Sequence, residues 1–159
     1  RMTYADEGEI AQVFLTRWFQ DSNNKIFNYI KSDGADVGKV LFEQAQSSVF
    51  DQVVSAEAYL PGILVPFNIA SRHGSTFVNG AIEGTALTAN TTPVALPDLS
   101  STDLDLAYDY MGTIRTFRIW DADLTDEGIA YVSERSEEPT ISLSFNRSES
   151  SFTVSDWLP

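Results

Sequence analysis

Residues 112–135 read GTIRTFRIWDADLTDEGIAYVSER, and this stretch decides the predicted fold. Residues 112–120 mix apolar and polar side chains in the manner of a half-buried strand. The side chains expected to face the core are those of Ile114, Phe117, Ile119 and Trp120. Because Ile114 and Phe117 are three positions apart rather than two, the strand needs a bulge near Arg115 to keep both on one face.

A short helix is predicted to follow over residues 125–135, after the chain leaves the sheet. Thr125 is placed to cap this helix, and Asp126 and Glu127 suit its positive N-terminal end. Arg135 falls in the last turn, where a cation is favoured. The side chains expected to face the core are Leu124, Ile129 and Val132.

A second local signal is a hairpin predicted at residues 75–85, STFVNGAIEGT. Asn79 and Gly80 would occupy its two central turn positions, where positive φ is needed. Residues 85–102 follow as an ordered crossover loop, and loops of that length are often functional. Turn signals and alternation predict further strands at residues 9–19, 25–31, 39–46, 48–58, 62–70, 103–107, 140–146 and 151–154.

Taken together, these two motifs resemble a known family. The pattern G-x-I-x-x-F-x-I-W followed by x-L-T-D-E-x-I, with V-N-G upstream, is similar to concanavalin A-like jelly rolls of the laminin G-like type. The resemblance implies an all-β, two-sheet jelly-roll sandwich with one short helix near residues 125–135. It also implies a place in bacteriophage tail fibres or tailspikes, or in secreted adhesins. The fold itself hosts lectins, glycan hydrolases and assembly modules.

The composition fits one globular domain. The chain has 159 residues, of which 43% are hydrophobic and 12% aromatic, and it has no cysteine. No apolar run approaches the roughly 20 residues that a membrane-spanning helix needs, so no membrane insertion is expected. A net charge of −13 disfavours binding to nucleic acid or to anionic lipid. The start at Arg1 leads us to expect a C-terminal fragment of a longer chain.

The sequence does not predict an enzyme. Glycoside hydrolysis needs two carboxylates flanking the bond, and Glu43, Asp51 and Glu57 stand singly on neighbouring strands. The one histidine, His73, precedes Gly74 in a predicted turn, where a solvated side chain is expected. A divergent glycan hydrolase whose acidic residues meet only in space stays open as an alternative.

Calcium is the one cofactor considered, and none is required by the pattern. The run Asp121–x–Asp123–x–x–Asp126 lacks the glycine and glutamate positions of an EF-hand loop, so we interpret it as a strand exit and helix cap. Asp33 and Asp36 share a loop and could join Asp51 or Asp109 at a Ca²⁺ ion. Our preferred interpretation of that loop is a simple turn.

Aromatic side chains are the remaining candidates for binding. Tyrosine and tryptophan rings stack on the C–H faces of sugars, although core packing is the default for each ring. The predicted ligand-binding residues are Tyr108, Asp109, Tyr110, Tyr29 and Asp33.

The favoured function is a non-catalytic module that recognises a host cell-surface glycan on a virion tail, or extracellularly, as a homo-oligomer such as a trimer. A purely structural trimerisation or capping domain is the main alternative.

Overall fold

The computed structural model describes residues 2–4, 12–56, 66–108, 110 and 112–134. The strands are β1 (Met2–Tyr4), β2 (Gln12–Asp21), β3 (Asn24–Lys31), β4 (Val40–Gln46), β5 (Val49–Val54), β6 (Ile69–His73), β7 (Val78–Ile82), β8 (Thr85–Ala86), β9 (Leu104–Leu106) and β10 (Gly112–Ile114). A 3₁₀ turn, η1, covers Gly34–Asp36, and the helix α1 covers Thr125–Ser133.

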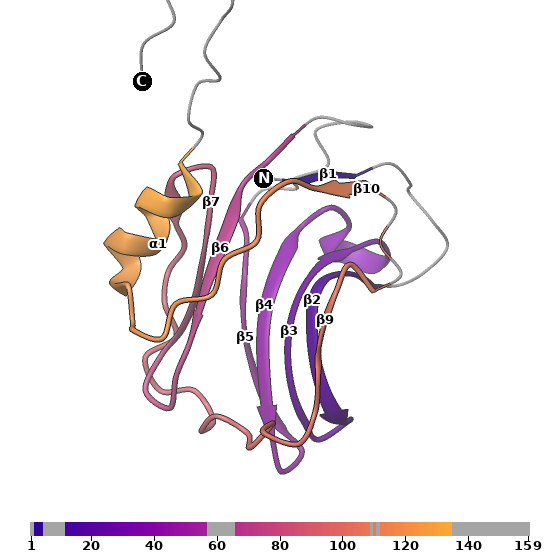
Figure 1. The fold of residues 1–159 in the computed structure, drawn as a ribbon. Coiled ribbons are helices and arrows are strands. Elements are labelled where there is room, and N and C mark those ends of the chain that lie inside the picture. The colour runs from indigo at the N-terminus through magenta and orange to yellow at the C-terminus, as the bar shows by residue number, and fades with distance from the viewer. Residues whose placement is uncertain (1, 5–11, 57–65, 109, 111, 135–159) are drawn as a thin grey trace, which may run out of the picture.

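The described residues form two larger antiparallel sheets and one short helix, an arrangement consistent with a β-sandwich. A five-stranded sheet in the order β5-β4-β3-β2-β9 lies beside a three-stranded sheet in the order β6-β7-β8 (Figure 1). The helix α1 lies against the three-stranded sheet. A small third sheet pairs β1 with β10.

Apolar side chains from both larger sheets form the core between them. The fully buried members of this cluster are Val13, Leu15, Ile30, Val40, Phe42, Phe67 and Ile82. Val40 and Phe42 of β4 show how alternate positions of a strand point to one face, whereas Phe67 enters this core from just before β6. We call the face of the five-stranded sheet that meets β6-β7-β8 the inner face, and the opposite one the outer face.

Several predicted strands are confirmed. Residues 39–46 and 103–107 contain β4 and β9, the described part of 48–58 contains β5, and 25–31 and the described part of 9–19 cover all but one or two residues of β3 and β2. The described part of the predicted strand 62–70 holds only the first two residues of β6, and the predicted strands 140–146 and 151–154 lie outside the described residues.

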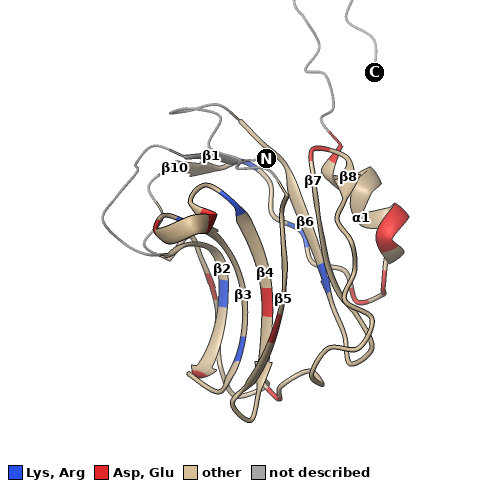
Figure 2. Cartoon of the chain, turned by 180° about the vertical axis from the view of Figure 1, so that it is seen from behind, with Lys and Arg blue, Asp and Glu red and all other residues tan. Residues whose placement is uncertain are grey.

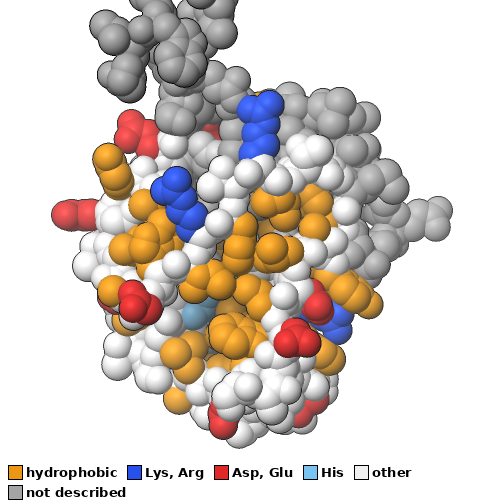
Figure 3. Space-filling view, in the orientation of Figure 1, with side chains coloured by type: hydrophobic (Ala, Val, Ile, Leu, Met, Phe, Trp, Pro, Cys, Tyr) orange, Lys and Arg blue, Asp and Glu red, His pale blue; other side chains and the backbone are white. Residues whose placement is uncertain are grey.

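The predicted strand over residues 112–120 is wrong beyond Ile114. β10 ends at Ile114, which pairs with Met2 of β1, and residues 115–120 belong to no strand, so no bulge near Arg115 forms. The chain then crosses past β6 towards α1 (Figure 1). Three side chains expected in the core are exposed instead: Phe117 at 41%, Ile119 at 71% and Trp120 at 43%. Figure 3 shows many hydrophobic side chains gathered on this side of the molecule.

The predicted turn at Asn79–Gly80 is also wrong. Both residues lie inside β7 and pair with Arg72 and Ser71 of β6. Gly80 is needed there because a Cβ atom would overlap the ring of Phe42, which packs across from the other sheet. The hairpin does exist, but its turn is Glu83–Gly84, where φ is 49° and 82° and β7 joins β8.

The predicted helix is confirmed as Thr125–Ser133, with Ile129 buried as expected. Thr125 is its first residue, and its hydroxyl lies 3.5 Å from the N–H of Gly128, which is a capping contact. The expectation for Val132 is wrong, because its side chain is 36% exposed. Ser133 is buried instead and accepts a hydrogen bond from the N–H of Gly84. Arg135 lies outside the described residues.

Candidate ligand-binding face

The outer face of the five-stranded sheet gathers aromatic and charged side chains. β2, β3 and β4 are bowed, and the outer face is their hollow side (Figure 1). A register shift in β2 between Phe14 and Thr16 inserts Leu15 as an extra residue, which is buried on the inner face. This bulge turns Phe14 and Arg17 to the same outer face, although their spacing of three would separate them in a regular strand.

Aromatic rings form a continuous surface around Phe14. Its ring centroid lies 4.8 Å from that of Phe27, 5.7 Å from that of Tyr29 and 6.1 Å from that of Tyr108. Phe19 stacks on Phe27 at 5.9 Å. Tyr29 and Phe27 are buried, whereas Tyr108 is 43% exposed, so the surface reaches solvent at Tyr108.

Arg17 lies at the exposed end of these rings. Its guanidinium carbon is 4.0 Å from the ring centre of Tyr108 and 4.5 Å from that of Phe19, which is cation–π geometry. A guanidinium nitrogen is 3.7 Å from a carboxylate oxygen of Asp105 on β9. The cation is therefore held in position by the rings, and its side chain is 19% exposed.

Lys25 and Glu43 form an ion pair in the middle of the same face. Their charged atoms are 2.9 Å apart, and the hydroxyl of Tyr29 donates to Glu43 at 3.1 Å. Lys25 also lies 4.8 Å from the ring centre of Phe27. Burial, and then the negative charge of Glu43, raise the pKa of Tyr29 well above its ordinary value, so the phenol stays a hydrogen-bond donor. Figure 2 shows basic residues on β2 and β3 near the acidic residue of β4.

The structure brings together some of the predicted binding residues. Tyr29 and Tyr108 both contact Phe14 on the outer face. Asp33 lies in the loop after β3, pairs with Lys31 at 3.1 Å and adds to the negative field that raises the pKa of Tyr29. Tyr110 is placed elsewhere, packed against the inner core cluster. Asp109 lies outside the described residues.

Sequence reasoning missed the charged members of this face. Alternation in β3 places Lys25, Phe27 and Tyr29 on one side, and this pattern was visible in the sequence. Arg17 could not be assigned in the same way, because the bulge at Leu15 is set by pairing with β3 rather than by a turn residue.

The arrangement can bind a ligand with apolar surface and hydroxyl groups. The exposed ring of Tyr108 offers a flat apolar platform, while Arg17 supplies donors and Asp105 supplies acceptors beside it. A mostly aromatic surface with a few placed polar groups is typical of small-molecule recognition sites.

The acidic residues proposed for calcium are engaged with protein partners. Asp36 pairs with Lys39 at 2.8 Å, and the carboxylate of Asp51 accepts hydrogen bonds from the Val94 N–H at 2.7 Å and the Asn90 amide at 3.2 Å. Within the described ranges, no three His, Asp or Glu side chains lie together as a metal-binding group.

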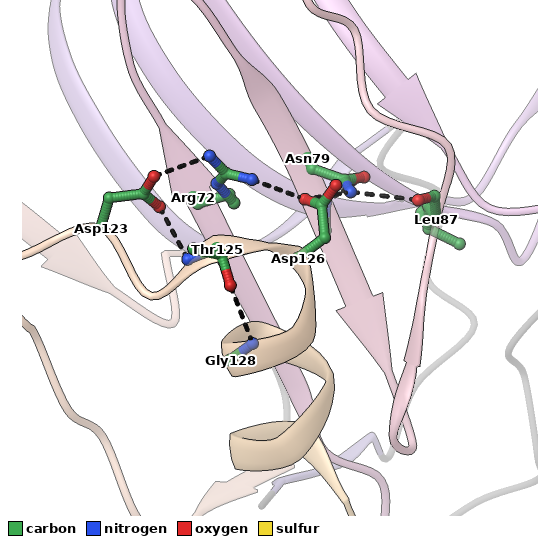
Figure 4. A network of polar contacts seen from close by, with 8 residues as sticks. Arg72, Asn79, Leu87, Asp123, Thr125, Asp126 and Gly128 are labelled. Carbon is green, nitrogen blue, oxygen red and sulfur yellow. Dashed lines mark hydrogen bonds and ion pairs between the residues drawn. The ribbon is translucent and has the colours of Figure 1, made fainter.

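The acidic run before α1 serves a structural purpose (Figure 4). Asp123 accepts from the N–H of Thr125, which is the predicted role at the helix start. Asp123 and Asp126 each also pair with Arg72 of β6 at 2.7 Å, and Asp126 accepts from Asn79 at 2.8 Å. Partial burial raises the pKa of Asp126, but the hydrogen bonds from Asn79 and Arg72 outweigh it and lower the net pKa. These contacts fasten α1 to the three-stranded sheet.

His73 is not a solvated turn residue, which corrects the prediction. It ends β6, and its Nε2 lies 3.2 Å from Oδ1 of Asn28, a buried residue of β3. Asn28 in turn donates to the hydroxyls of Thr16 and Ser71. Burial lowers the pKa of His73 from 6.5 to about 4, so the imidazole is neutral at pH 7. His73 therefore joins the two sheets through a polar cluster in the interior.

Comparison of the chain with protein-family models, with curated proteins and with solved structures finds no match. The fold therefore defines the class only as a mostly-β protein with two antiparallel sheets and a short helix. Among the described residues, no helix has the length and apolar character needed to cross a membrane.

Proposed function

We propose that this chain is a non-catalytic module that recognises a cell-surface glycan through the outer face of its five-stranded sheet. The observation that carries the proposal is the cluster of rings of Phe14, Tyr29 and Tyr108, which is exposed at Tyr108, with Arg17 held over the exposed ring. A sugar ring would place its C–H face on Tyr108, and its hydroxyls would reach Arg17 and Asp105.

The wider setting of this module follows from the family resemblance. We propose a concanavalin A-like jelly roll on a bacteriophage tail fibre, tailspike or similar appendage, or on a secreted adhesin. In that setting the partner is a glycan of the host envelope, and the module belongs to a homo-oligomer such as a trimer. No cofactor is required by this proposal, and Ca²⁺ is treated as a variable of the experiment.

A second candidate function is a purely structural capping or trimerisation domain. The observation that favours it is the exposed apolar segment that contains Phe117, Ile119 and Trp120. Exposed apolar patches of this kind mark protein–protein contacts in many proteins. The two candidates use different surfaces, because the proposed glycan site lies on the outer face of the larger sheet.

The test is binding of the purified chain to an array of bacterial-envelope glycans, in Ca²⁺ and then in a chelator. We expect saturable binding that Tyr108→Ala weakens by at least about tenfold, which is a loss of about 1.4 kcal/mol. The matched control is Tyr131→Ala, since Tyr131 is 77% exposed on α1 and lies outside the proposed site.

Loss of binding in chelator alone would show a metal requirement. Absence of binding by the folded chain in both conditions would favour the structural candidate. Release of oligosaccharide would instead show a hydrolase. Equal effects of Tyr108→Ala and Tyr131→Ala would move the site away from the outer face.

A further inference from the structure

The strand β5 is the last strand at one end of the five-stranded sheet. Among the residues that the structure describes, β5 pairs only with β4. Two of its apolar side chains are unusually accessible, with Val49 57% and Phe50 66% exposed. An edge strand of this kind presents unpaired main-chain groups on which another strand can dock.

The register with β4 shows which main-chain groups of β5 face outwards. Ser55 N–H donates to the C=O of Val40 at 3.0 Å, and continuation of the β4–β5 register pairs these two residues. In an antiparallel ladder, hydrogen-bonded and non-hydrogen-bonded pairs alternate along each strand. The residues of β5 that direct their N–H and C=O groups away from β4 are therefore Phe50, Gln52 and Val54.

β5 lacks the features that usually protect an edge. It contains no lysine and no proline, and its pairing with β4 shows no bulge. Its one charged residue, Asp51, is directed to the inner face, where the carboxylate holds Asn90 and Val94. The edge of β5 that faces away from β4 therefore presents main-chain N–H and C=O groups between the apolar side chains of this strand.

We propose that β5 of a second copy of this chain docks on this edge, antiparallel and related by a two-fold axis at Gln52. In this register Gln52 lies opposite the same residue of the second copy, and Phe50 lies opposite Val54. All three residues are the ones that direct main-chain groups outwards, so each pair exchanges both of its hydrogen bonds. The result is one continuous sheet with the same face on the same side in both copies.

Charge and face select this register over its neighbours. A shift by one residue would oppose side chains from different faces of the sheet, which the pleat does not allow. A shift by two in one direction would place Asp51 opposite Asp51 of the second copy at a close, non-hydrogen-bonded pair, where like charges repel. A shift by two in the other direction would place Phe50 opposite Ala56, beyond the end of β5 at Val54.

The net charge of the chain gives the contact a characteristic salt dependence. Each copy carries a formal charge of −13, so two copies repel one another at low ionic strength. Salt screens this repulsion but leaves main-chain hydrogen bonds and apolar contacts largely unchanged. Dimerisation through β5 is therefore expected to strengthen as salt is raised.

The experiment combines sedimentation with cysteine cross-linking, because the chain has no cysteine of its own. Gln52→Cys places two thiols across the axis with Cα atoms about 5.5 Å apart, which suits a disulfide. Phe50→Cys is the matched control, since its own counterpart lies four residues further along the partner strand. We expect Gln52→Cys to cross-link at least about tenfold faster than Phe50→Cys on mild oxidation.

Sedimentation equilibrium of the unmodified chain should show a dimer that tightens between low and high salt. Gln52→Pro should weaken this dimer by at least about tenfold without unfolding the chain, because the lost N–H faces away from β4. A monomer at both salt concentrations, a trimer without a two-fold contact, or equal cross-linking of the two cysteine variants would each overturn the proposal. The cysteine result decides the question even where Gln52→Pro fails to fold.

Discussion

The two faces of the five-stranded sheet are built from the same strands but are covered differently. The inner face carries Leu15, Ile30 and Phe42, and the three-stranded sheet buries them completely. The outer face carries Phe14, Arg17 and residues around the Lys25–Glu43 pair, and parts of it stay exposed. The inner face is therefore buried throughout these residues, whereas the outer face combines a second buried cluster of Phe27, Tyr29 and Leu41 with an exposed ring at Tyr108.

Packing against the second sheet decides which interactions the polar side chains of each face make. On the inner face Asn28 is hydrogen-bonded to His73 of the three-stranded sheet, so its polar group is tied into contacts between the sheets. On the outer face Arg17 and Lys25 lie over aromatic rings, and each cation is paired with a carboxylate, Asp105 and Glu43 respectively. Mutations on the inner face should therefore change the free energy of unfolding more than those on the outer face.

The largest effect is expected for Gly80→Ala on the inner side of the sandwich. The added Cβ atom would overlap the ring of Phe42, and we expect a loss of at least about 3 kcal/mol in the free energy of unfolding. Urea denaturation measures it. Gly34→Ala is the control, since it has a positive φ but open space around it and should cost only about 1 kcal/mol. Similar costs for both would contradict this packing.

A pH effect of intermediate size is expected from His73. Its pKa is about 4 in the folded chain and 6.5 ordinarily, so the unfolded chain binds a proton more readily as the pH falls below 6.5. The free energy of unfolding should therefore fall by about 1–3 kcal/mol between pH 6.5 and 4. Protonation of Asp and Glu side chains adds its own change to this component. His73→Gln should remove this component. Identical pH profiles for the two proteins would refute it.

The smallest effect is expected for Glu43→Gln on the outer face. The variant leaves Lys25 without its counter-ion at a site where the lysine is only 20% exposed, so we expect a loss of about 1–2 kcal/mol in thermal or urea unfolding. Asp36→Asn is the control, because its pair with Lys39 is at the surface and should change the free energy of unfolding by less than about 0.5 kcal/mol. A smaller effect at Glu43 than at Asp36 would contradict the difference between buried and exposed pairs.

Local patterns in the sequence predicted the elements that depend on neighbouring residues. Alternation identified β3, and Thr125 with the acidic residues after it identified the start of α1. Two of the predicted binding residues, Tyr29 and Tyr108, do meet on one surface. Nothing in their spacing predicted that Phe14 would join them, since that contact crosses between strands.

The errors occur where a distant partner overrides the local pattern. Asn79–Gly80 is a common turn pair, yet here glycine is needed so that Phe42 of another strand can approach. Residues 115–120 alternate as a strand should, but a strand forms only where a partner pairs with it, and among the described residues no strand pairs with this segment beyond the Ile114–Met2 pair. The position of His73 before Gly74 predicted a turn, whereas pairing with Val78 holds it in β6.

The sequence by itself determined that this chain is acidic, mostly β and provided with one short helix. These properties follow from composition and local periodicity. Only the tertiary structure decided which side of each strand is covered. That outcome depends on the bulge at Leu15 and on the packing of Phe42 over Gly80, which are contacts between strands. Long-range pairing therefore created the outer face with Arg17 and Tyr108, and it placed β5 at the end of its sheet, where β4 is its one strand partner in the part of the chain that the structure describes.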